Sequence, residues 1–158
     1  MKTKKIKLFV AILSIATLLS ACSSDEPTPT PDPVDPRDQM EGTYSGKIRL
    51  IDLDDNSIYE DVVTLKVVKS NLSSDRIDFY EDADLIFYAD KIIQADNGVG
   101  FVIPRQATDS DETCQGTSGY SLNGSKYDGI YSASRLECAV ECEDIDGWEY
   151  QVEFDLNK

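Results

Sequence analysis

The chain has 158 residues, of which 15 are basic and 30 acidic, so its formal net charge is −15. So much negative charge argues against binding to nucleic acid, because proteins hold phosphates with Lys and Arg. The sequence contains no histidine, which excludes Ser-His-Asp and Cys-His nucleophile systems and the usual catalytic zinc sites.

The N-terminal residues have the layout of a secretory signal peptide, with a cationic start, a short apolar core and then small residues. Four lysines lie among the first seven residues, and an apolar stretch follows from Leu8 to Leu19. That stretch is shorter than the roughly 20 apolar residues that a helix needs to span a bilayer. We therefore expect the chain to begin with a secretory signal peptide, whose end is taken below from a family resemblance as residue 21 (residues 1–21).

The sequence LSAC at residues 19–22 resembles the lipobox of bacterial lipoproteins. In that family the cysteine after the cut carries diacylglycerol and an amide-linked acyl chain such as palmitate. The resemblance implies that Cys22 becomes the first residue of the mature chain and anchors it. A lipidated cysteine of this kind carries more than one acyl chain, as stable retention in a membrane requires. The following SSDE at residues 23–26 resembles the surface-export signal of lipoproteins of the Bacteroidota. It implies an outer-membrane lipoprotein on the cell surface, with the periplasmic face of the outer membrane as the alternative.

Residues 22–40 are expected to be the lipidated cysteine and a proline-rich tether. Five of the six prolines lie within residues 27–36, and such a stretch prefers polyproline geometry of about 3.1 Å per residue. Residues 23–40 would then hold a domain roughly 50 Å from the membrane. The residues after position 21 include 11 basic and 30 acidic side chains, so the mature chain has a charge of about −19.

Residues 41–158 are expected to form one β domain, because apolar and polar residues alternate with the period of a strand. The clearest alternation runs through residues 44–50 and 63–67, with a turn over 52–57. Further strands are expected over 76–80, 84–88, 91–95, 99–103, 130–142 and 148–156, with a polar loop over 107–119. A helix over 82–95 is the alternative for the middle of the domain.

The last two strands are expected to form a hairpin through a turn at residues 143–147. Pairing Cys142 with Trp148 aligns Leu136 with Phe154 and puts every apolar side chain of the hairpin on one side, which is the condition that fixes register. The acidic side chains then share the outer face.

About eight antiparallel strands with one apolar face predict a β-barrel or a β-sandwich. The opening GTYSGKI at residues 42–48 and the ending YQVEFDL at residues 150–156 resemble the calycin-like β-barrel lipoproteins of the Bacteroidota. Those proteins have the shape of lipocalins, so the resemblance favours an all-β, antiparallel up-and-down barrel, with a β-sandwich as the alternative. It implies no functional residues, since members of this family mostly have no assigned activity.

Two function hypotheses follow for a module that binds rather than catalyses. In the first, Tyr44, Phe101, Trp148 and Tyr150 line a barrel mouth that captures a small apolar ligand or a glycan. Aromatic residues at strand spacing are also ordinary core residues, and a barrel of eight strands can be filled or hollow. In the second, the negative charge serves to dock or inhibit a basic protein partner such as lysozyme. An enzyme working with two carboxylates survives the absence of histidine, but the sequence places no such pair in a cleft.

Calcium is the one cofactor that the sequence suggests. The expected register sets Glu141 opposite Glu149 and Glu137 opposite Glu153, and like charges facing each other across a ladder are destabilising. A bound Ca²⁺, which takes carboxylate oxygens, would relieve both pairs, although solvation and screening would do the same. The DLDDN sequence at residues 52–56 resembles the start of a calcium loop, but the later positions lack the Gly and Glu that such a loop needs.

Three cysteines remain for the domain if Cys22 is lipidated, so at least one has no intrachain partner. Cys138 and Cys142 would lie about 13 Å apart along one strand, which is too far for a disulfide. The bridge is expected from Cys114 to either of them, and we favour Cys142 because a loop reaches a strand end more easily. The remaining thiol is expected to be buried and inert.

Replacing Cys22 by Ser should release the protein from membranes, because a serine hydroxyl does not become the thioether that holds the lipid. We expect the parent chain to partition into the detergent phase of a phase separation and Cys22→Ser to stay in the aqueous phase. Equal amounts of both proteins in the membrane fraction would contradict the lipid anchor.

Overall fold

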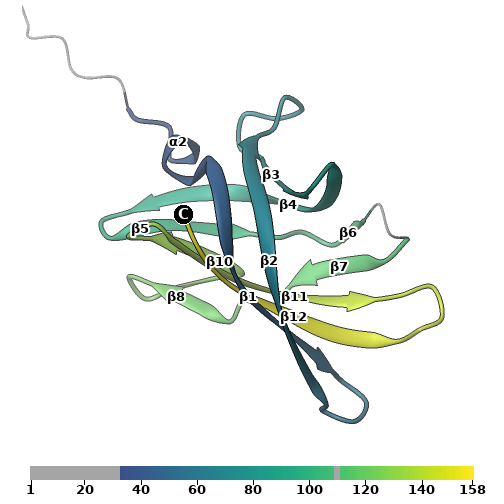
Figure 1. Ribbon diagram of the computed structural model, residues 1–158. Helices are drawn as coiled ribbons and strands as arrows, with labels where there is room; N and C mark the ends of the chain where they lie inside the picture. The colour runs from purple at the N-terminus through teal and green to yellow at the C-terminus, as the bar shows by residue number, and fades with distance from the viewer. Residues whose placement is uncertain (1–32, 109–110) are drawn as a thin grey trace, which may run out of the picture. The chain divides into compact units, whose positions relative to one another are not determined.

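The computed structural model describes residues 33–108 and 111–158, which form strands and one short helix (Figure 1). The expected signal peptide 1–21, Cys22 and the tether up to residue 32 lie outside the described residues. The compact unit begins at Val34. Its helix α2 (Arg37–Met40) buries Met40 completely in the core, so the last residues of the expected tether are part of the folded domain.

Eight strands close into a barrel in which every neighbouring pair is antiparallel. The ring follows the order β10-β5-β4-β3-β2-β1-β12-β11, and β10 pairs again with β11. This confirms the predicted antiparallel barrel of about eight strands, with β6–β9 inserted between β5 and β10. The strands are β1 (Gly42–Asp52), β2 (Ile58–Lys69), β3 (Ile77–Glu81), β4 (Asp84–Ala95), β5 (Gly98–Val102), β6 (Gln106–Ala107), β7 (Thr113–Gly116), β8 (Tyr120–Leu122), β9 (Ser125–Tyr127), β10 (Gly129–Ser132), β11 (Arg135–Glu143) and β12 (Glu149–Asn157).

Two strand predictions were wrong because local irregularities hide the alternation. Strand β4 is continuous where two short strands or a helix were expected, since its register with β5 shifts between Asp90 and Ile93. The single strand expected over 130–142 is two strands, β10 and β11. They are joined at Ala133 and Ser134, whose φ angles are 48° and 69°. Two consecutive positive φ angles are typical of a tight hairpin turn, which usually carries Asn or Gly.

Packed aromatic rings occupy the barrel interior. The ring centroid of Phe79 lies 4.5 Å from that of Phe87 and 5.8 Å from that of Phe101, and Phe87 lies 5.5 Å from Phe154. These four side chains come from β3, β4, β5 and β12, and none is more than 5% exposed. The same packing explains Gly129 of β10, because a Cβ there would lie 2.2 Å from Cζ of Phe101.

The closing hairpin keeps its predicted faces but differs from the predicted register by two residues. Cys142 pairs with Tyr150, and Cys138 pairs with Phe154. The turn has the predicted length but lies one residue further along the chain, where Oδ1 of Asp144 accepts the backbone N–H groups of both Asp146 and Trp148 at 2.9 Å. A shift of two residues leaves each side chain on its face, so Phe154 stays in the core while Trp148 leaves the ladder.

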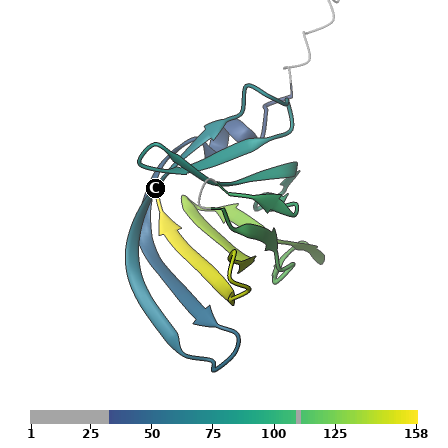
Figure 2. The same cartoon turned by 90° about the vertical axis from the view of Figure 1, so that its right-hand side faces the viewer.

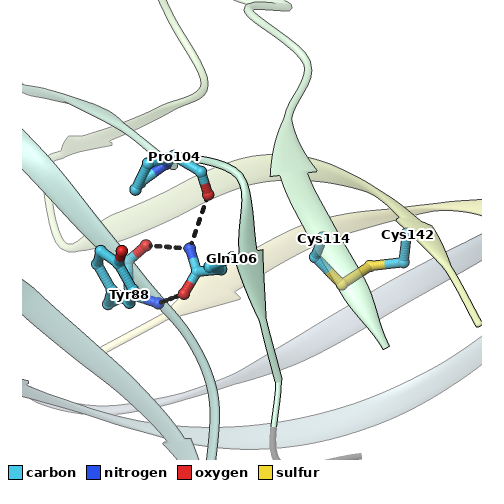
Figure 3. Close-up of a disulfide and its surroundings, with 5 residues drawn as sticks. All are labelled: Tyr88, Pro104, Gln106, Cys114 and Cys142. Carbon is cyan, nitrogen blue, oxygen red and sulfur yellow. Dashed lines mark hydrogen bonds between the residues drawn. A yellow bond between two sulfur atoms is a disulfide. The ribbon is translucent and has the colours of Figure 1, made fainter. Parts of the chain in front are cut away.

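A disulfide attaches the inserted segment to the closing hairpin (Figure 3). Strand β10 pairs with the first half of β11 and strand β7 with the second half, where Cys114 faces Cys142 and bonds to it. This is the pairing favoured from the sequence, although Cys114 lies in a strand rather than in a loop. Cys138 is free and fully buried, and burial raises the pKa of its thiol.

Two buried polar side chains complete the attachment of the inserted segment. The Gln106 amide accepts a hydrogen bond from the backbone N–H of Tyr88 at 2.7 Å and donates to the Tyr88 carbonyl at 2.8 Å, as a neighbouring strand would (Figure 3). The carboxylate of Asp128 accepts the backbone N–H groups of Ile103 and Ser118, each at 2.7 Å. Both side chains satisfy backbone groups that the change of strand partner would otherwise leave bare.

The last residue, Lys158, contacts helix α2 near the start of the barrel. The backbone N–H of Lys158 donates to the carbonyl of Ser134 at 2.9 Å, and its ammonium group donates to the carbonyl of Gln39 at 3.1 Å. The C-terminus therefore lies beside α2, at the start of β1.

Replacing both Cys114 and Cys142 by Ser should lower the free energy of unfolding by about 3–4 kcal/mol, because the bridge joins residues 28 positions apart. Urea unfolding of the Cys22→Ser protein, with and without the two substitutions, measures the loss. A reductant should lower the unfolding midpoint of the parent and leave that of the double variant unchanged. If the reductant left the urea unfolding midpoint of the parent unchanged, the stabilising role of the disulfide would be contradicted.

Candidate functional site

The turn ends of the β1–β2 and β11–β12 hairpins are bonded to each other. The indole N–H of Trp148 donates to Oδ2 of Asp52 at 2.9 Å, and the backbone N–H of Leu53 donates to the carbonyl of Glu149 at 3.1 Å. The rings of Trp148 and Tyr150 also pack together, with centroids 4.7 Å apart. We call residues 50–62 and 141–153 together the turn surface.

Asp52 holds the first turn in shape. Its Oδ1 accepts the backbone N–H groups of Asp54 at 2.8 Å and Asp55 at 3.3 Å, while its Oδ2 takes the indole N–H. The hydrogen bond from Trp148, assisted by those from the backbone, lowers the pKa of the Asp52 carboxyl below its ordinary value. The side-chain part of the link between the two hairpins is therefore strongest when the Asp52 carboxyl is ionised.

The turn surface has charge of one sign only. It contains 11 acidic residues and no basic residue. The nearest basic side chain along the first segment is Arg49, whose Nη1 lies 2.6 Å from Oε2 of Glu153. Most of the acidic side chains are exposed, so their field reaches solvent and favours a positively charged partner.

Exposed apolar side chains gather on the same surface. Of the nine large hydrophobic side chains exposed in residues 33–108 and 111–158, six belong to the turn surface. Scattered single exposed hydrophobic residues need no explanation, whereas a concentration of them marks an interaction site. The six are Leu53, Ile58, Tyr59, Val62, Ile145 and Trp148.

A small pocket lies on the outer sheet face at this end of the molecule. Its volume is about 100 Å³, below the range of roughly 300–1,000 Å³ that ligand sites occupy. Nη2 of Arg105 lies 3.8 Å from Oε2 of Glu143 at its wall. The pocket therefore suits the end of one basic side chain better than a whole lipid or sugar. Its lining residues are Leu53, Arg105, Thr113, Gln115, Glu141, Cys142, Glu143 and Glu149.

The four aromatic residues predicted to bind a ligand do not form one site. Tyr44 and Phe101 are fully buried, and the Tyr44 hydroxyl donates to the carbonyl of Met40 at 2.6 Å. Tyr150 is 6% exposed, whereas Trp148 is 36% exposed. Only Trp148 and Tyr150 lie together, in the turn surface.

The four glutamates predicted to bind calcium are also divided. The observed register places Glu141 opposite Gln151 rather than Glu149, and it places Glu137 opposite Asp155 rather than Glu153. Glu137 and Glu153 each lie beside an arginine, at 3.2 Å and 2.6 Å. Glu141 and Glu149 line the same small pocket. Among the residues that the structure describes, no three His, Cys, Asp or Glu side chains are grouped to hold a metal ion.

Sequence reasoning missed the exposed apolar members of the turn surface. Tyr59 and Val62 of β2 are 62% and 72% exposed. Tyr59 is on the inner face of β2 and is exposed because β3 stops short of it, whereas Val62 is on the outer face, opposite to the buried Val63. The available signal was the repeated occurrence of acidic residues with single apolar ones at both hairpin turns. We interpret those acidic residues above only as turn residues or as calcium ligands.

The chain matches no protein-family model and no curated protein. Within the described ranges, no helix combines the length and the apolar character that a membrane crossing requires. The closed eight-strand barrel is compatible with a calycin-like fold, and the turn surface is its most distinctive chemical feature.

Acidification should weaken the Asp52–Trp148 bond only below pH 3.8, the ordinary pKa of an aspartate, because a neutral carboxyl is a weaker acceptor than a carboxylate. Because folding lowers this pKa, the bond contributes stability above that pH and loses it as the pH falls through the folded value. Trp148 is the only tryptophan, so its fluorescence reports the change directly.

The Asp52→Asn variant should lose this fluorescence transition, since the amide does not titrate. Asp54→Asn is the matched control, because it removes the same charge two residues away without touching the indole. An identical acid transition in Asp52→Asn and in the parent would contradict the assignment.

Proposed function

We propose that this chain is a lipid-anchored protein of the outer membrane, displayed on the cell surface, that binds a basic protein partner through the turn surface. The observation that carries the proposal is the combination of 11 acidic residues, no basic residue and six exposed large hydrophobic side chains at one end of the barrel. The anchor rests on the resemblance of residues 19–26 to lipoprotein signals.

The two kinds of side chain would have separate tasks in binding. Acidic side chains attract a basic partner over long distances and orient it, which raises the association rate. Tryptophan and tyrosine dominate the binding energy of many interfaces, and Trp148 and Tyr59 are the exposed aromatic residues here. Both are fixed on hairpins that bond to each other, so little conformational freedom is lost on binding.

Lysozyme represents the class of partner that we propose, a small cationic protein that meets the outer surface of a cell. Such a partner has arginine and lysine side chains whose ends would enter the pocket on the side of Glu141 and Glu149, away from the Arg105–Glu143 pair. Binding could dock the partner or block its action. We propose no catalytic activity and no obligatory cofactor for the chain itself.

Capture of a glycan or a small apolar ligand is the second candidate. The packed pair of Trp148 and Tyr150 supports it, because a partly exposed indole offers a flat apolar face to a sugar ring. The filled aromatic interior favours the first candidate. The two differ in their response to salt, since capture of a neutral ligand should be nearly independent of ionic strength.

Binding of lysozyme to the Cys22→Ser protein should weaken by about tenfold or more between roughly 0.05 and 0.5 M salt, because screening shortens the reach of the charges.

Asp54→Lys reverses a charge in the turn surface and should weaken binding several-fold. Asp96→Lys is the matched control in the β4–β5 turn, with the same change of net charge, and should bind within about twofold of the parent. Isothermal titration calorimetry measures all three proteins.

Two results would contradict the proposal. Equal losses in Asp54→Lys and Asp96→Lys would show that net charge alone attracts lysozyme and that the turn surface has no special part. Absence of binding at low salt would exclude this partner class.

A further inference from the structure

Part of strand β2 is an open sheet edge. Strand β1 pairs with β2 from Ile58 to Val67, whereas β3 pairs with it only from Leu65 to Lys69. Among the residues that the structure describes, residues 58–64 therefore have a neighbouring strand on one side only. Figure 2 shows β2 as the outer strand of this hairpin, and Figure 1 shows the hairpin extending away from β3.

The register identifies which backbone groups point outward from this edge. The backbone N–H of Ser70 donates to the carbonyl of Arg76 at 3.2 Å, on the side of β3. Because successive residues of a strand point their backbone groups in alternate directions, the even-numbered residues face this side. The outward N–H and C=O groups thus belong to Ile58, Glu60, Val62 and Thr64, in a stretch without any register shift.

This edge lacks most of the features that normally protect an edge strand. Natural proteins use proline, lysine, a bulge or a covering segment to prevent a new strand from pairing. Residues 58–64 contain no proline, glycine or lysine, and Ile58, Tyr59 and Val62 are between 52% and 72% exposed. The remaining protection is acidic, since Oδ1 of Asp61 accepts the outward N–H of Val62 at 2.7 Å.

We propose that residues 58–64 of β2 bind an extended segment of the partner by strand addition, with adjacent basic residues opposite Glu60 and Asp61. This inference rests on the proposed function, because it specifies how a basic partner engages the turn surface. Backbone hydrogen bonds would supply affinity and the alternate side chains would supply selectivity. A partner segment with apolar residues on both sides of two lysines or arginines complements Ile58, Tyr59 and Val62.

Charge argues against a second copy of this chain as the occupant. Antiparallel self-pairing centred on Asp61 would place that residue opposite itself, with the Glu60 side chains of both copies nearby. Like charges directly across a ladder are destabilising. A basic segment converts the same two acidic side chains from a barrier into a favourable contact.

The test uses the capped peptide Thr-Val-Val-Lys-Lys-Val-Thr and the Cys22→Ser protein. A matched peptide has the same side chains but carries N-methyl groups on the amides that would face β2. Fluorescence anisotropy at low salt should show binding of the parent peptide and at least about tenfold weaker binding of the methylated one. Equal binding of both would overturn strand addition, and so would the absence of binding by both.

Two variants of Val62 test the edge from the side of the protein. Val62→Pro removes an outward N–H without removing a bond to β1, a position where a strand tolerates proline, so it should abolish peptide binding. Val62→Thr keeps the N–H and should bind within about twofold of the parent. Peptide binding by Val62→Pro at parent strength would overturn the proposal.

If Val62→Pro does not fold, amide hydrogen exchange gives an independent readout on the Cys22→Ser chain that keeps Val62. The peptide should slow the exchange of Ile58, Glu60 and Val62 and leave Tyr59 and Asp61 unchanged, since the latter already face β1. Equal protection of odd and even residues would overturn strand addition.

The lysozyme titration separates this inference from the proposed function. Lysozyme binding that depends on Asp54, together with no difference between the two peptides, would leave the proposed function standing and reject the edge. Peptide binding at the edge without any lysozyme binding would do the reverse. Salt-resistant dimerisation that Val62→Pro abolishes would show that a second copy occupies the edge and would overturn the basic partner.

Discussion

Closure of the sheet depends on one short strand. Strand β10 pairs with β5 over three residues and with β11 over four, and these ladders turn an open sheet into a barrel. Gly129 makes the closure sterically feasible, because a side chain there would meet both the Phe101 ring and Cβ of Cys138 within 2.6 Å. The aromatic core therefore packs directly against the backbone of the closing strand, and only glycine at position 129 leaves room for this contact.

Because β10 is short, it leaves half of β11 without a partner on that side. The inserted segment supplies the partner through β7, which the disulfide holds and which Asp128 joins to the start of β10. In the same region the Gln106 side chain bonds the backbone N–H and carbonyl of Tyr88, as a neighbouring strand would. The inserted segment is therefore part of the barrel wall, and its strand β7 pairs with the half of β11 that contains Glu141 and Glu143.

The fold could be predicted from the alternation of side chains, but the register could not. Phe154 and Leu136 lie inside as expected, since alternation determines the face. The shift of two residues arises from hydrogen bonds to the Asp144 side chain, which alternation does not report. Tight turns without glycine, as at Ala133 and Ser134, and the irregularity near Asp90 are also hidden from sequence patterns.

The site was less predictable, because exposure depends on where neighbouring strands end. The position of Tyr59 in the alternation is that of a core residue, and it is exposed only because β3 stops short of it. The negative charge and the candidate Trp148 and Tyr150 were evident from the sequence. Their union in one surface results from bonds between residues almost a hundred positions apart.

The contact of Lys158 with the helix that precedes β1 has a consequence for topology. Lys158 contacts both Gln39 and Ser134, so the entry and exit of the barrel share one pole. Strand β1 then runs 11 residues before the first acidic turn, which lies at the opposite pole. A domain fused to Lys158 would lie at the pole where β1 begins and leave the acidic pole clear, and a short loop joining Lys158 to the start of α2 would permit circular permutation of the barrel.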